Sequence, residues 1–248
     1  SNLFKILFVV SALMLTANLW GGFDYMGLQS YPVTYKMMET VNGLSAFFVL
    51  IILVFYSGEL VWRDRGSHIN EVIDATPHNS TISLIAKTLS LISVGTILSL
   101  FFILAATLYQ LGNGYTKLEI GVYLQNFIYT AFPMYIVWSC ILVFVQIIIN
   151  NKYLGYFVSI LLLFLLDILF LILEVETNML NIGSGPSYIY SDMNGFGSAL
   201  AGSNWFNIYW VLFGVLLLAL SGLIWVRGVT FGFKNRIKSA KKHLTTQY

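Results

Sequence analysis

Long apolar runs without a charged residue constrain this chain more than any other feature. Residues 160–166, for example, read Ile-Leu-Leu-Leu-Phe-Leu-Leu and are apolar on every face of a helix. Soluble proteins keep about a quarter of their residues charged, whereas this chain has 10% charged and 58% hydrophobic residues. The excess apolar surface must face lipid, so we expect an all-α integral membrane protein. Strands of a β-barrel would alternate in polarity, which these runs do not.

Six segments are expected to cross the membrane, since a span needs about 20 mostly apolar residues. With their flanks, they are Leu3–Trp20, Leu44–Tyr56, Ile82–Tyr109, Leu124–Ile149, Tyr153–Leu173 and Ile208–Val226. Pro133 is the expected kink in the fourth segment, because proline has no backbone N–H. The expected organisation is a six-helix transmembrane domain over residues 1–233, followed by a basic tail over residues 234–248.

Basic residues set the expected orientation, because Lys and Arg accumulate in short cytoplasmic loops. With the amino terminus inside, two basic residues lie outside, Lys36 and Lys117, and eleven lie on the cytoplasmic side. We therefore expect both termini, and the basic tail, to be cytoplasmic. The cytoplasmic set is Lys5, Arg63, Arg65, Lys87, Lys152, Arg227, Lys234, Arg236, Lys238, Lys241 and Lys242.

The cytoplasmic connection after the second span, about residues 59–77, is expected to hold a short amphipathic helix. Ser67 can cap its start and Pro77 can end it. Between them, Ile69, Val72 and Ile73 share one face at helical spacing. Such a helix either lies on the lipid surface or presents this face to a cytosolic partner. The charges that precede it equally suit a solvated surface beside the membrane.

The same connection resembles a known family. Arg63-Asp64-Arg65-Gly66-Ser67, followed by Glu71-Val72-Ile73-Asp74-Ala75-Thr76-Pro77, is similar to the stretch after the second span of ABC-2 type transporter permeases. The segments 58–63, 190–197 and 225–228 look closest to the membrane part of bacterial permeases fused to a zinc aminopeptidase-like domain. The resemblance implies a coupling helix that contacts an ATPase subunit. It assigns that contact to Arg63, Arg65, Gly66, Glu71 and Pro77, and helical spacing adds Ile69, Val72 and Ile73.

The resemblance further implies a multi-pass protein of the bacterial inner membrane that acts as half of an exporter. Its expected partners are an ABC ATPase subunit, membrane lipid and a second permease half, which is either a second copy in a homodimer or a missing part of a longer chain. Nothing points to nucleic acid. The chain has no His-Glu-x-x-His and no Gly-x-x-x-x-Gly-Lys-Ser/Thr motif, so the peptidase part is absent and no ATPase activity is expected here. His68, His78 and His243 are scattered, so we expect no metal site, no cofactor and no catalytic residue.

Carboxylates in or beside the spans are the remaining candidates. Asp167 lies in the middle of the fifth span, where a charge is costly. It either forms a polar contact between helices or lines a transport path. The external segment, about residues 174–207, holds a possible outer gate or cation site, although solvation alone explains its charges. The candidates for this gate are Glu174, Glu176, Tyr190, Asp192 and Asn194, and Tyr188 could contribute to it with them.

Two other classes of function stay open at this point. The chain could be a membrane anchor or scaffold for an associated enzyme, which would need the spans only as a tether. It could also be an ion-coupled secondary transporter that depends on Asp167 and has no ATPase partner.

Overall fold

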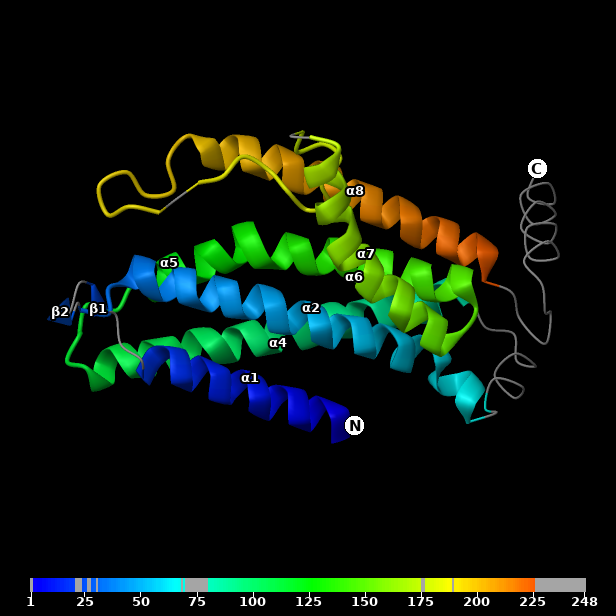
Figure 1. Ribbon diagram of the computed structural model, residues 1–248, viewed down its shortest axis with the longest axis horizontal. Coiled ribbons are helices and arrows are strands. Elements are labelled where there is room, and N and C mark those ends of the chain that lie inside the picture. Colours follow the sequence, from blue (N-terminus) through cyan, green and yellow to red (C-terminus); the bar gives the residue numbers. More distant parts are fainter. Residues whose placement is uncertain are drawn as a thin grey trace.

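The computed structural model describes residues 2–20, 24–25, 28–29, 31–67, 69, 80–174, 177–188 and 190–225. Long helices lie side by side in one elongated bundle, and a two-stranded hairpin sits at one end (Figure 1). The elements in order are α1 (Asn2–Trp20), β1 (Asp24–Tyr25), β2 (Leu28–Gln29), α2 (Thr34–Gly66), α4 (Ser80–Gly112), α5 (Ile120–Asn126), the π-helical turn η1 (Phe127–Ala131), α6 (Phe132–Ile149), α7 (Lys152–Ile172) and α8 (Ala199–Ile224).

The helices have the length and composition of membrane spans. Among the described residues, five helical segments are long and apolar enough to cross a membrane, namely α2, α4, the run Ile120–Ile149, α7 and α8. The α1 helix is shorter, with an apolar part over Phe4–Leu19. Its 19 residues span about 28 Å, whereas the 33 residues of α2 span about 50 Å. The expectation of a helical, multi-pass membrane protein is thus confirmed.

Two helices, α2 and α8, extend furthest beyond the expected spans. The second span was expected over Leu44–Tyr56, but α2 continues to Gly66, so the first part of the expected coupling helix is the end of α2. Ser67 ends α2, and its hydroxyl donates to the carbonyl oxygen of Arg63 at 2.9 Å. The helix that Ser67 was expected to start falls almost entirely outside the described residues. The α8 helix begins at Ala199, so the irregular external segment is shorter than expected. Polar residues can continue a helix beyond the hydrocarbon region, and an apolar run therefore underestimates helix length.

The α6 helix is the centre of the bundle, with α2, α4, α7 and α8 packed around it. Tyr135 and Leu142 on α6 are 0% exposed. The α8 helix approaches it closely at Gly214, where an added Cβ would lie 3.3 Å from the Cβ of Cys140. Cys140 is free and buried in this contact. Small residues at a contact between spans allow such close approach of the backbones.

Pro133 was expected to kink the fourth segment, and the structure has the π-helical turn η1 directly before α6, the helix that contains this proline in its first turn. In a regular α-helix the N–H of residue 133 would donate to the carbonyl oxygen of Tyr129, and proline has no N–H to give. That carbonyl oxygen accepts a hydrogen bond from the side chain of Asn207 on α8, at 2.8 Å. A neighbouring helix therefore supplies a donor where proline removed one.

Two adjacent asparagines form the tight connection between α6 and α7. Asn150 ends α6 with a left-handed backbone (φ 54°), a conformation that asparagine tolerates better than most residues. The side chain of Asn151 then accepts hydrogen bonds from the N–H groups of Tyr153 and Leu154, at 3.0 and 3.2 Å. Asn151 thereby caps the start of α7.

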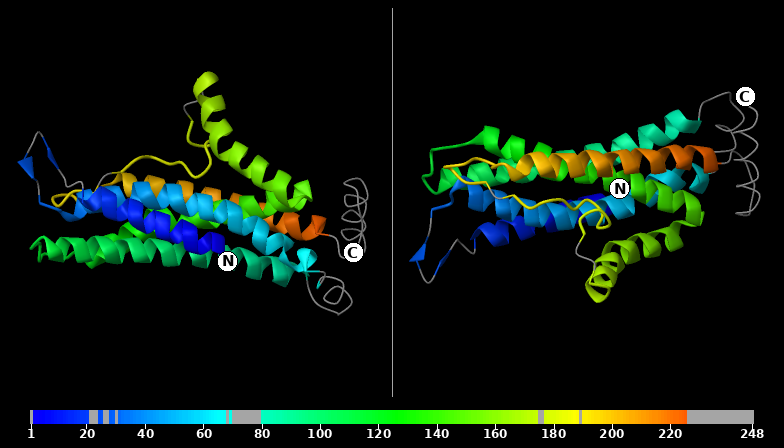
Figure 2. Two further views of the ribbon diagram at one scale, coloured as in Figure 1. Left: turned by 60° about the horizontal axis from the view of Figure 1, so that its bottom comes forward. Right: turned by 90° about the horizontal axis from the view of Figure 1, so that it is seen from above.

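The α7 helix leaves the bundle along its length. Figure 2 shows its far end pointing away from the other helices. Gly155 and Ser159, in its first half, are buried against the bundle. Phe164 and Leu171, in its second half, are 57% and 80% exposed. The second half of α7 therefore presents apolar side chains outward, as a surface in contact with lipid requires.

Candidate functional site

Five helices meet at one end of the bundle around a group of charged and aromatic residues. We call Trp62, Asp64, Arg65, Lys87 and Trp225 the Arg65 cluster. The guanidinium of Arg65 donates a hydrogen bond to the Oδ1 of Asn150 at 3.1 Å. Its central carbon lies 5.2 Å from the ring centre of Trp62 and 4.9 Å from that of Trp225. Both distances are typical of cation–π contacts, so Arg65 joins the ends of α2, α6 and α8.

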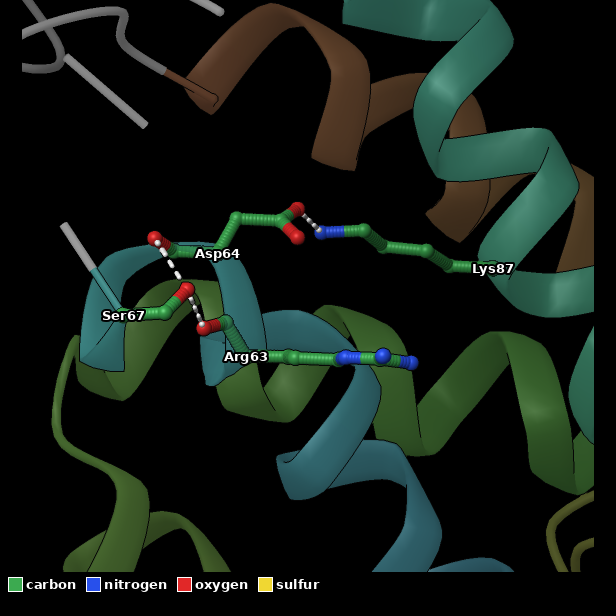
Figure 3. A network of polar contacts seen from close by, with 4 residues as sticks. All are labelled: Arg63, Asp64, Ser67 and Lys87. Atoms are coloured by element: carbon green, nitrogen blue, oxygen red, sulfur yellow. Dashed lines mark hydrogen bonds and ion pairs between the residues drawn. The ribbon is translucent and has the colours of Figure 1, made fainter. Parts of the chain in front are cut away.

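Lys87 brings the start of α4 into the same cluster. Its ammonium lies 2.7 Å from a carboxylate oxygen of Asp64, and the two side chains point directly at each other (Figure 3). The same ammonium lies 5.5 Å from the ring centre of Trp225. The Lys87 side chain is 13% exposed, so this contact is less screened by water than a surface ion pair.

A charge swap tests this ion pair. We expect Asp64→Lys or Lys87→Asp alone to lower the free energy of unfolding by about 1 kcal/mol, because each places like charges together in a partly exposed site. The double variant should recover most of the loss. Thermal unfolding in detergent measures both effects, and a double variant no more stable than the worse single variant would contradict the assignment.

The start of α7 is held against this cluster by close contacts. Trp62 donates from its indole N–H to the side-chain oxygen of Gln146 on α6, at 3.0 Å. Gln146 is 0% exposed, and an added Cβ at Gly155 of α7 would overlap its amide. Lys152, the first residue of α7, pairs with Glu59 of α2 at 2.7 Å. The α2, α6 and α7 helices therefore meet with little free space.

The expected coupling residues fall into three groups. Arg63 and Gly66 are exposed at the end of α2, while Arg65 is partly buried within the Arg65 cluster. Ile69 is 52% exposed just beyond α2. Glu71, Val72, Ile73 and Pro77 lie outside the described residues. The two arginines therefore have different surroundings, a distinction that their shared sequence pattern did not indicate.

A second polar group lies about 30 Å further along α2, toward its start. Asn126 of α5 donates to the side-chain oxygen of Asn42 at 2.8 Å, and Asn42 donates in return at 3.4 Å. Thr130 donates to the same Asn126 oxygen at 3.3 Å and shares a 2.6 Å hydrogen bond with the hydroxyl of Tyr188. These contacts tie the segment after α7 to α2 and to the run Ile120–Ile149.

Two hollows of about 280 and 250 Å³ open on this group and share Asn42, Asn126 and Tyr188 as lining residues. We call the pair the Asn126 crevice. Burial raises the pKa of Tyr188, although its hydrogen bond with Thr130 acts in the opposite direction. The Tyr188 hydroxyl is therefore protonated at neutral pH and can both donate and accept a hydrogen bond.

Of the expected gate residues in the described part of the chain, only Tyr190 lines the Asn126 crevice, together with Tyr188. Asp192 and Asn194 are exposed in the turn that the Ser191–Gly195 bridge closes. Glu174 is exposed just after α7 with φ 53°, and Glu176 lies outside the described residues.

Sequence reasoning missed most of the crevice. Its lining includes Glu39, Asn42, Asn126 and Thr130, which come from two apolar helices. The available signal was the pair of asparagines beside or within apolar spans, because an amide in lipid needs a partner. The sequence contains no indication that these two asparagines are partners.

Neither Asp167 nor a metal site can be assigned to the Arg65 cluster or to the Asn126 crevice. Asp167 lies within α7, but its side chain is outside the described part of the structure, so its role stays a prediction. Across the described residues, no group of three or more His, Cys, Asp or Glu side chains is placed to hold a metal ion.

No family model matches this chain, and no curated protein or solved structure does either. The helices are those of a multi-pass membrane protein. A more specific function has to be argued from the Arg65 cluster and the Asn126 crevice.

Proposed function

We propose that this chain is the membrane-spanning half of an ABC-2 type exporter, driven by a separate ATPase subunit in the bacterial inner membrane. The observation that supports this best is the Arg65 cluster, which joins the ends of several helices directly beside the connection after α2. A partner that pushes on residues 67–74 would act on α2 first. Arg65 and Lys87 would pass the movement on to α4, α6 and α8.

The proposed topology has six spans, with α1 as the first, and both termini in the cytoplasm. The positive-inside rule then places the Arg65 cluster at the cytoplasmic surface and the Asn126 crevice at the outer surface. ATP-driven closure of the partner would tilt the helices about their packed centre and widen the outer crevice. Transport by this route needs no chemical reaction on the substrate.

The proposed assembly contains a second copy or a second permease half, because six spans are about half of what the permeases that this sequence resembles use. Lipid surrounds the rest, including the outward second half of α7. The basic tail over residues 234–248 would lie near anionic headgroups.

The test is a double change at exposed positions, Arg63→Glu with Ile69→Asp. We expect recovery of a native ATPase with the purified protein to fall at least about tenfold, while thermal stability in detergent stays unchanged, because neither side chain supports the bundle. Lys5→Glu is the matched control, since Lys5 is an exposed basic residue of α1 on the same proposed side.

A different result is expected for Arg65→Glu, which should lower stability and ATPase recovery together. Unchanged ATPase recovery and unchanged transport in the Arg63→Glu, Ile69→Asp variant would contradict a coupling role for these two residues. Loss of folding in that variant would equally contradict the placement of these two side chains outside the bundle.

A further inference from the structure

One wall of the Asn126 crevice is a single face of α2. Tyr35, Met38, Glu39 and Asn42 line it. They recur at spacings of three and four residues, so they stack along one side of the helix. The crevice therefore has a rigid wall with one aromatic ring, one carboxylate and one amide.

The opposite wall comes from the irregular segment after α7 and is aromatic. Tyr188, Tyr190 and Phe196 line this side. The Phe196 ring centre lies 5.9 Å from that of Tyr188 and 5.1 Å from that of Tyr190, with steep angles between the planes. Phe196 therefore packs against both tyrosines, and the three rings form one aromatic surface.

The charges around the crevice are negative. Glu39 is a lining residue of the 280 Å³ hollow, and none of the described residues that line it is a lysine or an arginine. Desolvation and the nearby carboxylates of Glu119 and Asp192 raise the pKa of Tyr190, so two further negative groups lie close to this wall. Lys36 and Lys117 are not among the lining residues. An anionic ligand would therefore be repelled, and a cationic one attracted.

We infer that the Asn126 crevice binds an organic ammonium group, either a soluble amine or the headgroup of a lipid. Aromatic faces combined with a carboxylate are the arrangement that recognises quaternary ammonium groups. A hollow of about 280 Å³ is at the small end of ligand sites and suits a compact headgroup. This inference does not depend on an ATPase partner or on transport.

Equilibrium dialysis with radiolabelled choline tests it, using the protein in a maltoside detergent. We expect saturable binding of choline, and none of its uncharged isostere 3,3-dimethylbutanol. Glu39→Gln should weaken choline binding about tenfold, because it removes charge and keeps shape. Lys36→Gln, one turn away on α2, is the matched control and should bind as tightly as the unchanged protein or more tightly.

A second pair of variants tests the aromatic wall. Tyr190→Leu should weaken choline binding several-fold, whereas Tyr190→Phe keeps the ring and should retain it. Thermal unfolding confirms that each variant is folded. Equal binding of choline and its isostere, or unchanged affinity in folded Glu39→Gln, would overturn the inference, as would absence of choline binding to the folded protein.

Reconstitution into lipid discs distinguishes the two possible sources of the ammonium group, a lipid headgroup and a soluble amine. Loss of choline binding in phosphatidylcholine discs but not in phosphatidylglycerol discs indicates a lipid headgroup in the crevice. Equal binding in both indicates a soluble amine. Either result supports an ammonium site, since each requires choline to bind.

Discussion

Gly155→Ala is expected to destabilise the protein by about 1–3 kcal/mol, because it forces a side chain into a contact that has no room. The new Cβ would overlap the amide of Gln146. That amide cannot move aside cheaply, since Gln146 is 0% exposed and its oxygen accepts the hydrogen bond of Trp62 at 3.0 Å. The start of α7 would have to separate from α6, or the Trp62 hydrogen bond would break.

Thermal unfolding in detergent measures the loss, and Gly43→Ala is the matched control. No atom lies within 4 Å of an added Cβ at Gly43. That change should therefore be neutral or stabilise by about 0.5–1 kcal/mol, as alanine does in helices. Combining Gly155→Ala with Gln146→Ala should cost less than the sum of the two single changes. Simple additivity would show that the two side chains do not interact.

Asn207→Leu is expected to destabilise the protein by about 1–3 kcal/mol, because the Tyr129 carbonyl oxygen loses the donor that compensates for Pro133. The hydrogen bond that would be lost is 2.8 Å long and joins α8 to the η1 turn. Leucine keeps the approximate volume but offers no N–H. The two helices should therefore pack less tightly beside the Asn126 crevice.

Pro133→Ala provides the diagnostic partner for that change. Alanine has a backbone N–H that can donate to the Tyr129 carbonyl, so Asn207→Leu should cost clearly less in the Pro133→Ala background. Asn18→Leu is the control, since the Asn18 amide bonds a carbonyl of its own helix and is exposed. If Asn207→Leu costs the same in both backgrounds, Asn207 does not compensate for the proline.

The local parts of the fold were predictable from particular residues. The expected segment Leu124–Ile149 lies within the run Ile120–Ile149, and an irregular π-helical turn lies just before Pro133. The residues at which the helices end, outside the apolar runs, were less predictable. The second span was expected over Leu44–Tyr56 with its flanks, whereas α2 runs from Thr34 to Gly66, because polar residues can continue a helix beyond the apolar run.

The candidate sites were predictable only in part. Arg63 and Arg65 were grouped by a shared pattern, yet one is exposed and the other joins three helices. Tyr190 was expected near an outer gate and lines the crevice, whereas Glu39, Asn42 and Asn126 were not expected there. A side chain's surroundings depend on how its helix is rotated against its neighbours, and a single sequence does not contain that rotation.

The sequence by itself determined that this chain is helical and lipid-embedded, because transfer of an apolar run into hydrocarbon depends only on that run. Only the tertiary structure decided which residues form the two polar groups. The Trp62–Gln146 and Asn42–Asn126 contacts each join residues 84 positions apart. Such partners meet only when the axial offset and rotation of packed helices are fixed, and close packing around α6 fixes both.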